Sequence, residues 1–356
     1  MKKFYKILSI IICISFCALL LCCSQTKVMT FTAFNSPVRI EARDKGLTSK
    51  VQNQINEIFQ TLENTFDNDN PLSDTYKTNN AKVGEKVNLS QPTVELLTLS
   101  KELYQFTDKK FNPANLPLSR LWKFENYPVL NFTPPTNLEV TSLLGDATDL
   151  DGISLSEQEC VKNLDIQLDF GGIVKGYAVD KTLEVLRSNG YSQGYINVGN
   201  SSLAILSVPS LGVRHPRANE QMPVLLSVDL SEKQFVTVST SGDYERYYEY
   251  QGQRYCHIID STNGYPVNTG VQSATIIGCG GAISDALTTA LCAYNHTPLD
   301  IENSPLVNFM KKIISAYTDC DIYVAFENEG VKQLITNKEQ GKDFTLFDTT
   351  YQVVKI

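Results

Sequence analysis

The amino-acid sequence predicts an α+β fold: a mixed, largely antiparallel sheet with flanking helices. Strand-like segments outnumber helical ones, and most of them follow one another at the short spacing of hairpins. A few helical stretches with an apolar stripe separate these runs. With 356 residues, 42% of them hydrophobic, the chain can bury a core large enough for such a sheet and its helices.

The first 22 residues have the pattern of a bacterial lipoprotein signal peptide. A basic start, MKKFYK, precedes the apolar run ILSIIICISFCALLL, and Leu20-Leu21-Cys22-Cys23 resembles a relaxed lipobox. We therefore expect a lipid on Cys23, a tether over 23–30, and a body anchored to the inner membrane that faces the periplasm or the cell exterior. The alternatives are acylation of Cys22 and an uncleaved anchor helix, for which the apolar run is short.

The elements of the first half are predicted from periodicity and capping. Residues 48–66 place apolar side chains on one stripe of a helix, and a second helix begins near Ser90, with Pro92 in its first turn. Turn-rich residues separate these helices, and residues 131–140 form a loop.

In the second half, strands surround two helices. LDIQLDF (164–170) is predicted as a strand, KGYAVDKTLEVLRSNG (175–190) as a helix that ends at Gly190, and SDALTTALCAY (284–294) as the second helix. Further strands are expected in YINVG, LLSVDL, FVTVST, SATIIGC, IYVAF and VKQLIT.

Cysteine spacing and charge exclude several classes of site. The five cysteines of the body show no CxxC pair and are odd in number, which argues against a structural zinc site or a dense disulfide scaffold. We expect mostly buried thiols at Cys160, Cys256, Cys279, Cys292 and Cys320. The net charge of −8 argues against a nucleic-acid partner, and an anionic nucleotide would need local cations or a metal ion.

Two stretches could hold a phosphate and a metal. In LDFGGIVKGY (168–177), glycines would let an anion approach a helix N-terminus between Asp169 and Lys175, but a tight structural turn explains the pattern equally well. On the second predicted helix, Asp285 and Thr289 share one face and offer two hard oxygen ligands that suit Mg²⁺. An aspartate in the N-cap region and a back-bonded threonine are the plain alternative.

A third stretch, STSGDYERYYEYQGQRYCHIIDSTNGYPV (239–267), contains His257 and Asp260. A histidine in such a place is more often structural than catalytic. Only three histidines occur in the chain, so a His-rich metal site is not expected, and no GxSxG elbow supports a Ser-His-Asp hydrolase.

Taken in order, LDFGGIVKGYAVD, the stretch 239–267 and SDALTTAL resemble the hallmark segments of the FAD:protein FMN transferase (ApbE) family. FNSPVRI and KFNPANLPLSRLWKF are weaker matches, and the likeness runs from about Phe31 to Leu334. We therefore expect one ApbE-like domain over 31–338 and a C-terminal tail over 339–356.

The resemblance implies a function and a site. Members of the family bind FAD and Mg²⁺, cleave the flavin's pyrophosphate, and join FMN through a phosphoester to a Thr or Ser of an acceptor flavoprotein. The implied metal ligands are Asp285, Thr289 and the carbonyl of Gly172. The implied FAD contacts are Phe111, Asn112, Asp169, Lys175 and Ile259, with Asp69 at a further flavin-facing position. The implied catalytic residues are Asp285 and His257, the side chain best suited to take the acceptor's proton.

Four positions depart from the family pattern. Asn112 replaces an acid, Ser261 a proline and Asn200 a glycine. Asp69 stands where many members carry an aromatic that can stack on the flavin nucleotide. Loss of that stacking makes FAD pyrophosphatase activity, which yields FMN and AMP, an alternative. A non-catalytic FAD-binding lipoprotein is the other alternative, although intact metal ligands favour the enzyme.

Overall fold

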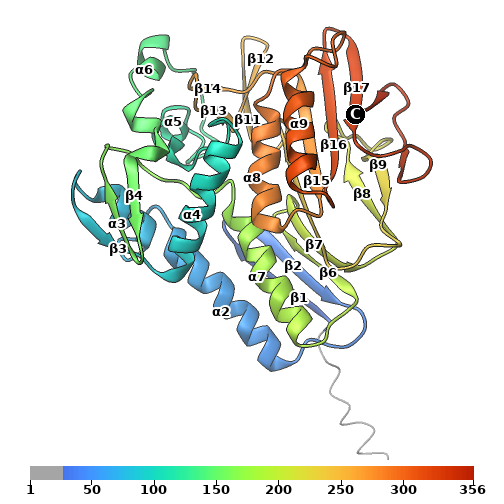
Figure 1. Cartoon of the computed structure of the whole chain (residues 1–356), viewed down its shortest axis with the longest axis horizontal. Coiled ribbons are helices and arrows are strands. Elements are labelled where there is room, and N and C mark those ends of the chain that lie inside the picture. The colour runs from blue at the N-terminus through green and yellow to red at the C-terminus, as the bar shows by residue number, and fades with distance from the viewer. Residues whose placement is uncertain (1–26) are drawn as a thin grey trace, which may run out of the picture.

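The computed structural model describes residues 27–356 and confirms the α+β class (Figure 1). Its centre is a nine-stranded sheet in the order β1-β2-β6-β7-β10-β15-β16-β17-β19. All neighbours in it are antiparallel except β17 and β19. Its strands are β1 (Val28–Ala33), β2 (Ser36–Ala42), β6 (Gly194–Val198), β7 (Ser202–Ser207), β10 (Val236–Gly242), β15 (Val271–Ile277), β16 (Asp321–Asn328), β17 (Val331–Thr336) and β19 (Gln352–Lys355).

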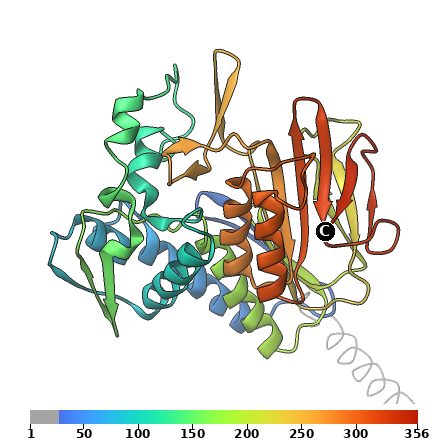
Figure 2. The ribbon, with the colours of Figure 1, turned by 45° about the horizontal axis from the view of Figure 1, so that its top comes forward.

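Helices cover one face of this sheet, and a small sheet covers part of the other (Figures 1 and 2). The helices of this layer are α2 (Ser49–Phe66), α7 (Val174–Ser188), α8 (Gly281–Cys292) and α9 (Pro305–Ala316). The small sheet consists of β8 (Ser210–Arg214), β9 (Val224–Asp229) and β18 (Phe344–Leu346). Each layer contributes apolar side chains to a separate core cluster, so the large sheet is buried from both sides.

A lobe of short elements lies beside the helical layer, at the left of Figure 1. It contains α3 (Asp74–Asn80), β3 (Lys86–Asn88), α4 (Gln91–Phe106), α5 (Leu116–Leu121), α6 (Asn137–Thr141), β4 (Ile153–Ser156) and β5 (Glu159–Lys162). Two ribbons lie near the C-terminal end of α8: β11 (Tyr247–Tyr250) with β12 (Gln253–Cys256), and β13 (Ile259–Asp260) with β14 (Tyr265–Pro266). A third core cluster, around Trp122, joins the lobe to these ribbons.

The helices form where capping and periodicity predict them. Thr48 caps α2 by accepting a hydrogen bond from the Val51 amide, and the buried side chains of α2 lie on one stripe. Ser90 is the N-cap of α4, although its side chain makes no capping hydrogen bond there. Among residues 27–356, no helix is both long and apolar enough to span a bilayer. The signal peptide and Cys23 lie outside the described residues.

Two expectations about the chain's layout need correction. Residues 164–170 alternate in burial as predicted but belong to no strand. The Asn79 side chain of α3 bonds both the amide and the carbonyl of Leu168, where a strand would bond to a neighbouring strand. The segment 339–356, expected as a tail, carries β18, which pairs with β9, and β19, which pairs with β17. That segment is therefore part of the fold.

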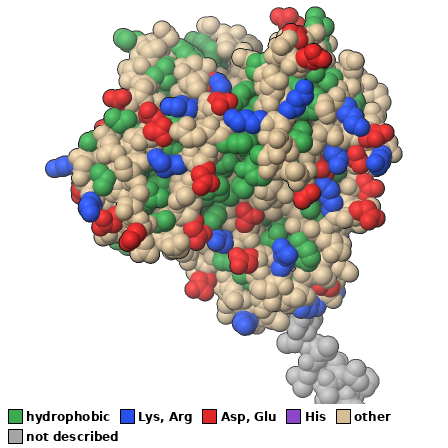
Figure 3. All heavy atoms as spheres, in the orientation of Figure 1, with side chains coloured by type: hydrophobic (Ala, Val, Ile, Leu, Met, Phe, Trp, Pro, Cys, Tyr) green, Lys and Arg blue, Asp and Glu red, His purple; other side chains and the backbone are tan. Residues whose placement is uncertain are grey.

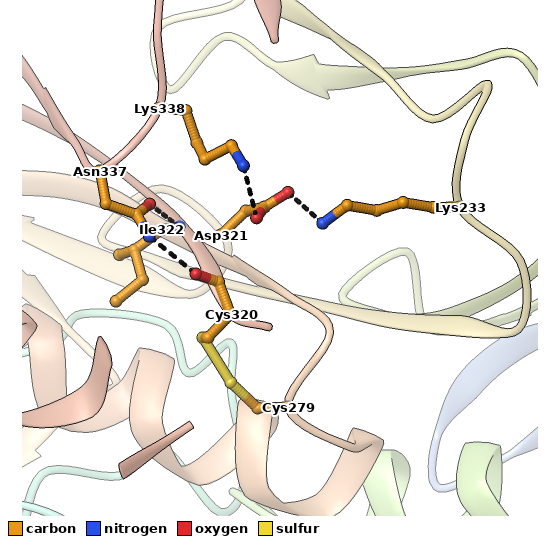
Figure 4. The surroundings of a disulfide bond; sticks show 7 residues. All are labelled: Lys233, Cys279, Cys320, Asp321, Ile322, Asn337 and Lys338. Carbon is orange, nitrogen blue, oxygen red and sulfur yellow. Dashed lines mark hydrogen bonds and ion pairs between the residues drawn. A yellow bond between two sulfur atoms is a disulfide. The ribbon is translucent and has the colours of Figure 1, made fainter. Parts of the chain in front are cut away.

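The expectation of mostly buried thiols holds for three of the five cysteines of the body, but Cys279 and Cys320 form a disulfide (Figure 4). Antiparallel pairing of β15 with β16 places Ile277 opposite Asp321, which brings the residues just beyond these positions together, with a Cα–Cα distance of 5.5 Å. Cys160, Cys256 and Cys292 are free and buried, as expected.

Candidate active site

The candidate site forms where α7 and α8 approach each other most closely. A Cβ atom added at Gly176 would lie 2.1 Å from the Gly281 carbonyl oxygen, so only glycine allows this contact. The close approach lets the Gly176 amide donate a hydrogen bond to the Asp285 carboxylate at 3.1 Å. The third glycine of LDFGGIVKGY is thus required by helix packing, and that packing places Asp285 at the N-terminal end of α7.

The three implied metal ligands gather at this point. Asp285 is buried, and the Thr289 hydroxyl, one turn further along α8, donates to the Asp285 carbonyl at 3.1 Å and lies 3.3 Å from Ser241 Oγ. An added Cβ at Gly172 would lie 3.9 Å from Thr289 Oγ1 and 3.6 Å from the Phe111 ring. Four predicted site residues, Gly172, Asp285, Thr289 and Phe111, therefore lie together.

The donor set fits Mg²⁺. It offers a carboxylate, a hydroxyl and a carbonyl, all hard oxygens, and Mg²⁺ usually keeps several water ligands beside one or two protein carboxylates. Burial raises the pKa of Asp285, and the charge of Lys175 opposes that effect. A bound cation would favour the ionised carboxylate further. Within residues 27–356 no cluster of three or more His, Cys, Asp or Glu side chains could hold a metal, so a site rich in such ligands is excluded there.

The turn before α7 is organised by its own charged residues. Asp169 Oδ1 accepts from the Gly171 amide at 2.8 Å, and Lys175 Nζ donates to the Gly171 carbonyl at 2.9 Å. A Cβ at Gly171 would lie only 3.1 Å from Asp169 Oδ1, so a side chain there would crowd the turn. Asp169 does not cap α7, whose N-cap is Ile173. The charge of Lys175 acts on both Asp285 and His257.

The remaining predicted contacts lie around this turn. The Asp169 amide donates to the Pro113 carbonyl at 2.7 Å, which ties the turn to the segment that follows Phe111 and Asn112. The Asn112 side chain is engaged within the fold: its Nδ2 donates to the Thr148 carbonyl and its Oδ1 accepts from the Ala114 amide. Only its backbone is free for the implied FAD contact.

Ile259 and Asp69 lie on different parts of the fold. Ile259 is buried in β13, opposite Pro266, and lies two residues beyond His257. Asp69 is exposed on the loop between α2 and α3. Hydrogen bonding to the Glu125 carboxylate raises the pKa of Arg120, and the charges of Asp69 and Asp169 add smaller effects in the same direction.

His257 is partly exposed and packs edge-on to Phe124. Its Nδ1 lies 3.2 Å from the Arg246 carbonyl oxygen, which selects the tautomer that donates from Nδ1 and leaves Nε2 as an acceptor. Burial among protein atoms, and then the positive charges of Arg246 and Lys175, lowers the pKa of His257 to about 3. The imidazole is therefore neutral near pH 7.

Two further residues, not predicted from the sequence, have a place in the candidate site. Arg246 is exposed beside His257, and within residues 27–356 its guanidinium forms no ion pair, so it can meet an anion. Asp180 accepts from the amides of Gly281 and Ala282 at 2.6 and 2.9 Å and so caps α8. Arg246 lies inside the motif STSGDYER and Asp180 inside KGYAVD. Their charge within these motifs is the feature of the sequence that could have indicated them as site residues.

Fold and site together define an α+β enzyme whose centre combines oxygen ligands with cationic side chains. The family described as ApbE matches residues 33–299, and the chain belongs to it. A relative from Klebsiella pneumoniae, named FAD:protein FMN transferase, is 26% identical over 340 residues, which cover 93% of this chain and 98% of the relative.

Solved structures of ApbE proteins share the fold. The ApbE protein of Thermotoga maritima is 25% identical with a TM-score of 0.71, over 85% of this chain and 94% of that one. The flavin transferase ApbE of Vibrio cholerae is 19% identical with a TM-score of 0.73, over 87% of this chain and 96% of that one.

Proposed function

We propose that this chain is a Mg²⁺-dependent FAD:protein FMN transferase, which attaches FMN through a phosphoester to a Thr or Ser of an acceptor flavoprotein and releases AMP. The observation that carries the proposal is the convergence of Asp285, Thr289 and Gly172 beside the cationic turn at Lys175. A protein that only stored FAD would not need metal ligands placed for its phosphates. The names of the relatives agree with this proposal.

The chain's residues supply positioning and charge. Asp285, Thr289 and the Gly172 carbonyl would hold Mg²⁺, which supplies charge neutralisation at the diphosphate. Lys175 and Arg246 offset further negative charge. The acceptor hydroxyl attacks the FMN phosphorus, its proton passes to Nε2 of His257, the bond from that phosphorus to the bridging oxygen breaks, and AMP leaves. His257 is a weak base in the free protein, and the anionic substrate would offset the neighbouring positive charges and raise its basicity.

FAD hydrolysis is the second candidate function, since water can replace the acceptor hydroxyl at the same phosphorus. The observation that favours it is the exposed Asp69 carboxylate, which offers no ring to stack on a flavin. Both reactions release AMP, but only transfer leaves FMN on a protein.

A test of the function uses the purified body with FAD, Mg²⁺ and a Thr-bearing acceptor protein. We expect the acceptor to gain the mass of FMN less one water while AMP accumulates, and EDTA to stop both. Absence of AMP and of any mass change, with FAD bound, would leave the non-catalytic binding protein as the function.

We also propose that the mature chain begins at Cys23, carries a lipid there, and works on the outer side of the inner membrane. The basic and apolar N-terminal pattern supports this, and so does the disulfide, because such bonds persist in oxidising compartments. Intact-mass analysis of membrane-extracted protein should give a diacylated or triacylated chain starting at Cys23. A mature chain that keeps Met1 would contradict the proposal.

A further inference from the structure

The backbone that leads into the site is held by a side chain instead of a strand. The Leu168 amide donates to Asn79 Oδ1 at 2.6 Å, and Asn79 Nδ2 donates to the Leu168 carbonyl at 2.9 Å. Asn79 belongs to α3 and is 7% exposed. An amide that both donates and accepts in this way substitutes for one residue of a neighbouring strand.

A buried lysine supports the same segment. Lys162, in β5, is 1% exposed, and its ammonium donates to the carbonyls of Asn79 at 3.1 Å and Ile166 at 3.3 Å. Asp165 Oδ1 lies 3.5 Å away. Three donors therefore meet three oxygens, as a buried ammonium requires. Lys162 thus links α3, through Asn79, to the backbone two residues before Leu168.

These contacts end next to the candidate ligands. Leu168 precedes Asp169, the first residue of the turn, and lies four residues before Gly172. On its other side the segment is tied by the Asp169 amide, which donates to the Pro113 carbonyl. The segment is fixed from both sides immediately before the backbone that carries the implied metal carbonyl.

Stability alone does not explain a charge in this place. Replacing buried ionic groups by apolar side chains of similar size is often neutral or stabilising, so a methionine at position 162 could fill the space at less cost. A methionine could not replace the hydrogen bonds of Lys162, which fix the orientation of two backbone carbonyls, those of Asn79 and Ile166, in separate segments.

We propose that Asn79 and Lys162 are positioning residues of the active site: they fix the backbone at Leu168 and thereby aim Asp169 and the Gly172 carbonyl at the flavin diphosphate and its Mg²⁺. The identity of these ligands rests on the proposed function. Partners that orient the ligands of a metal typically change its affinity 10- to 100-fold when they are removed.

The test compares Asn79→Ala and Lys162→Met with two matched controls. Asn80→Ala removes the next amide, which is exposed and bonds only within its own helix. Lys86→Met removes an exposed lysine of β3, the strand that pairs with β5. Mg²⁺ is titrated into each variant with FAD, and binding is followed by flavin fluorescence. We expect the half-saturating Mg²⁺ concentration to rise about 10-fold in the two test variants and to stay at the wild-type value in the controls.

Hydrogen exchange without substrate gives the second readout. Exchange should accelerate in residues 164–173 of the test variants while the rest of the chain keeps its protection. Wild-type Mg²⁺ dependence in folded Asn79→Ala and Lys162→Met would overturn the proposal, and so would exchange accelerated throughout the chain, which indicates a general structural role. Because neither readout needs turnover, a wild-type protein that releases no AMP would defeat the proposed function without deciding this one.

Discussion

Asp285 is the only carboxylate among the proposed metal ligands, and it is buried against the N-terminal end of α7. Burial raises the pKa of this carboxyl, so the metal-free fold binds its proton more tightly than the unfolded chain does. The contribution of Asp285 to the free energy of unfolding is therefore favourable at low pH and is lost as pH rises. At neutral pH its buried charge opposes folding in the absence of a metal.

Replacing Asp285 with Asn should therefore separate stability from activity. The amide keeps an acceptor for the Gly176 amide but carries no charge, so in EDTA at pH 7 the melting temperature should rise. Mg²⁺-dependent turnover should fall roughly 1000-fold, since a metal contributes several kcal/mol of charge stabilisation. Thr289→Val should lose less, because water can replace a neutral ligand. Wild-type turnover of Asp285→Asn at low Mg²⁺ would show that the metal site is assigned wrongly.

His257 affects the pH dependence of stability in the opposite direction from Asp285. Its pKa falls from 6.5 to about 3 in the fold, so the unfolded chain binds more protons between these values. The free energy of unfolding should decrease as pH falls through this window, and His257→Gln should reduce that decrease, as measured by denaturant titration at several pH values. The profile of kcat/KM for FAD should show no acidic limb near pH 6.5 from this residue. Equal pH slopes in the variant and the wild type would refute the assignment.

At the scale of elements, the sequence predicts what is encoded locally. Helix α2 follows from its apolar stripe and Thr48, and the Asp285–Thr289 pair follows from helical spacing on α8. Residues 164–170 have the pattern of a strand, but the backbone of Leu168 bonds to the side chain of Asn79, 89 positions away, and not to another strand. Alternating burial reveals an extended backbone, but it does not reveal what bonds to it.

The sequence points to individual members of the candidate site but not to how they come together. Sequence motifs indicate Gly172, Asp285 and Lys175. The contact of Gly176 with Gly281, which brings α7 and α8 together, depends instead on how the two helices pack. The disulfide between Cys279 and Cys320 could not be predicted either, because a separation of 41 residues matches no motif and the pairing of β15 with β16 brings the two cysteines together.

The disulfide should stabilise the junction of β15, α8 and β16. Asp321, the residue after Cys320, pairs with Lys233 at 2.5 Å and Lys338 at 3.2 Å, so this end of β16 is already held by charge (Figure 4). Replacing both cysteines with serine should lower the free energy of unfolding by about 2–4 kcal/mol, as expected for a loop of this length. Denaturant curves of the variant and of the reduced wild type should agree. Unchanged midpoints in both would mean that the bond does not form.

At the scale of the whole molecule, the face that carries the helices has charges of both signs (Figure 3). Figure 3 shows acidic and basic side chains mixed over the face that carries the helices, with no broad field of one sign. With a net charge of −8, long-range attraction does not bring an anionic dinucleotide to this protein. Local cations must do so, and two are available: Lys175, whose charge acts on Asp285, and the exposed Arg246 next to His257.

The balance between transfer and hydrolysis depends on which hydroxyl reaches the FMN phosphorus. A positioned protein hydroxyl gains several kcal/mol over free water. FAD alone should therefore give slow release of FMN and AMP, and an added acceptor should divert FMN to protein. Asp69 lies exposed on the loop between α2 and α3.

Asp69→Tyr should place a ring where the flavin nucleotide can stack on it and should lower hydrolysis more than transfer, because a held nucleotide leaves less room for water. AMP release from FAD, measured with and without acceptor, gives both rates. Leu72→Tyr, an aromatic at an exposed position of the same loop, is the matched control and should change neither. If FAD alone gave no AMP over hours and Asp69→Tyr changed nothing, hydrolysis would be discarded as an activity. A strict transferase would then remain the proposed function, because the proposed metal ligands and Lys175 would serve cleavage of the same bond whichever hydroxyl attacks it.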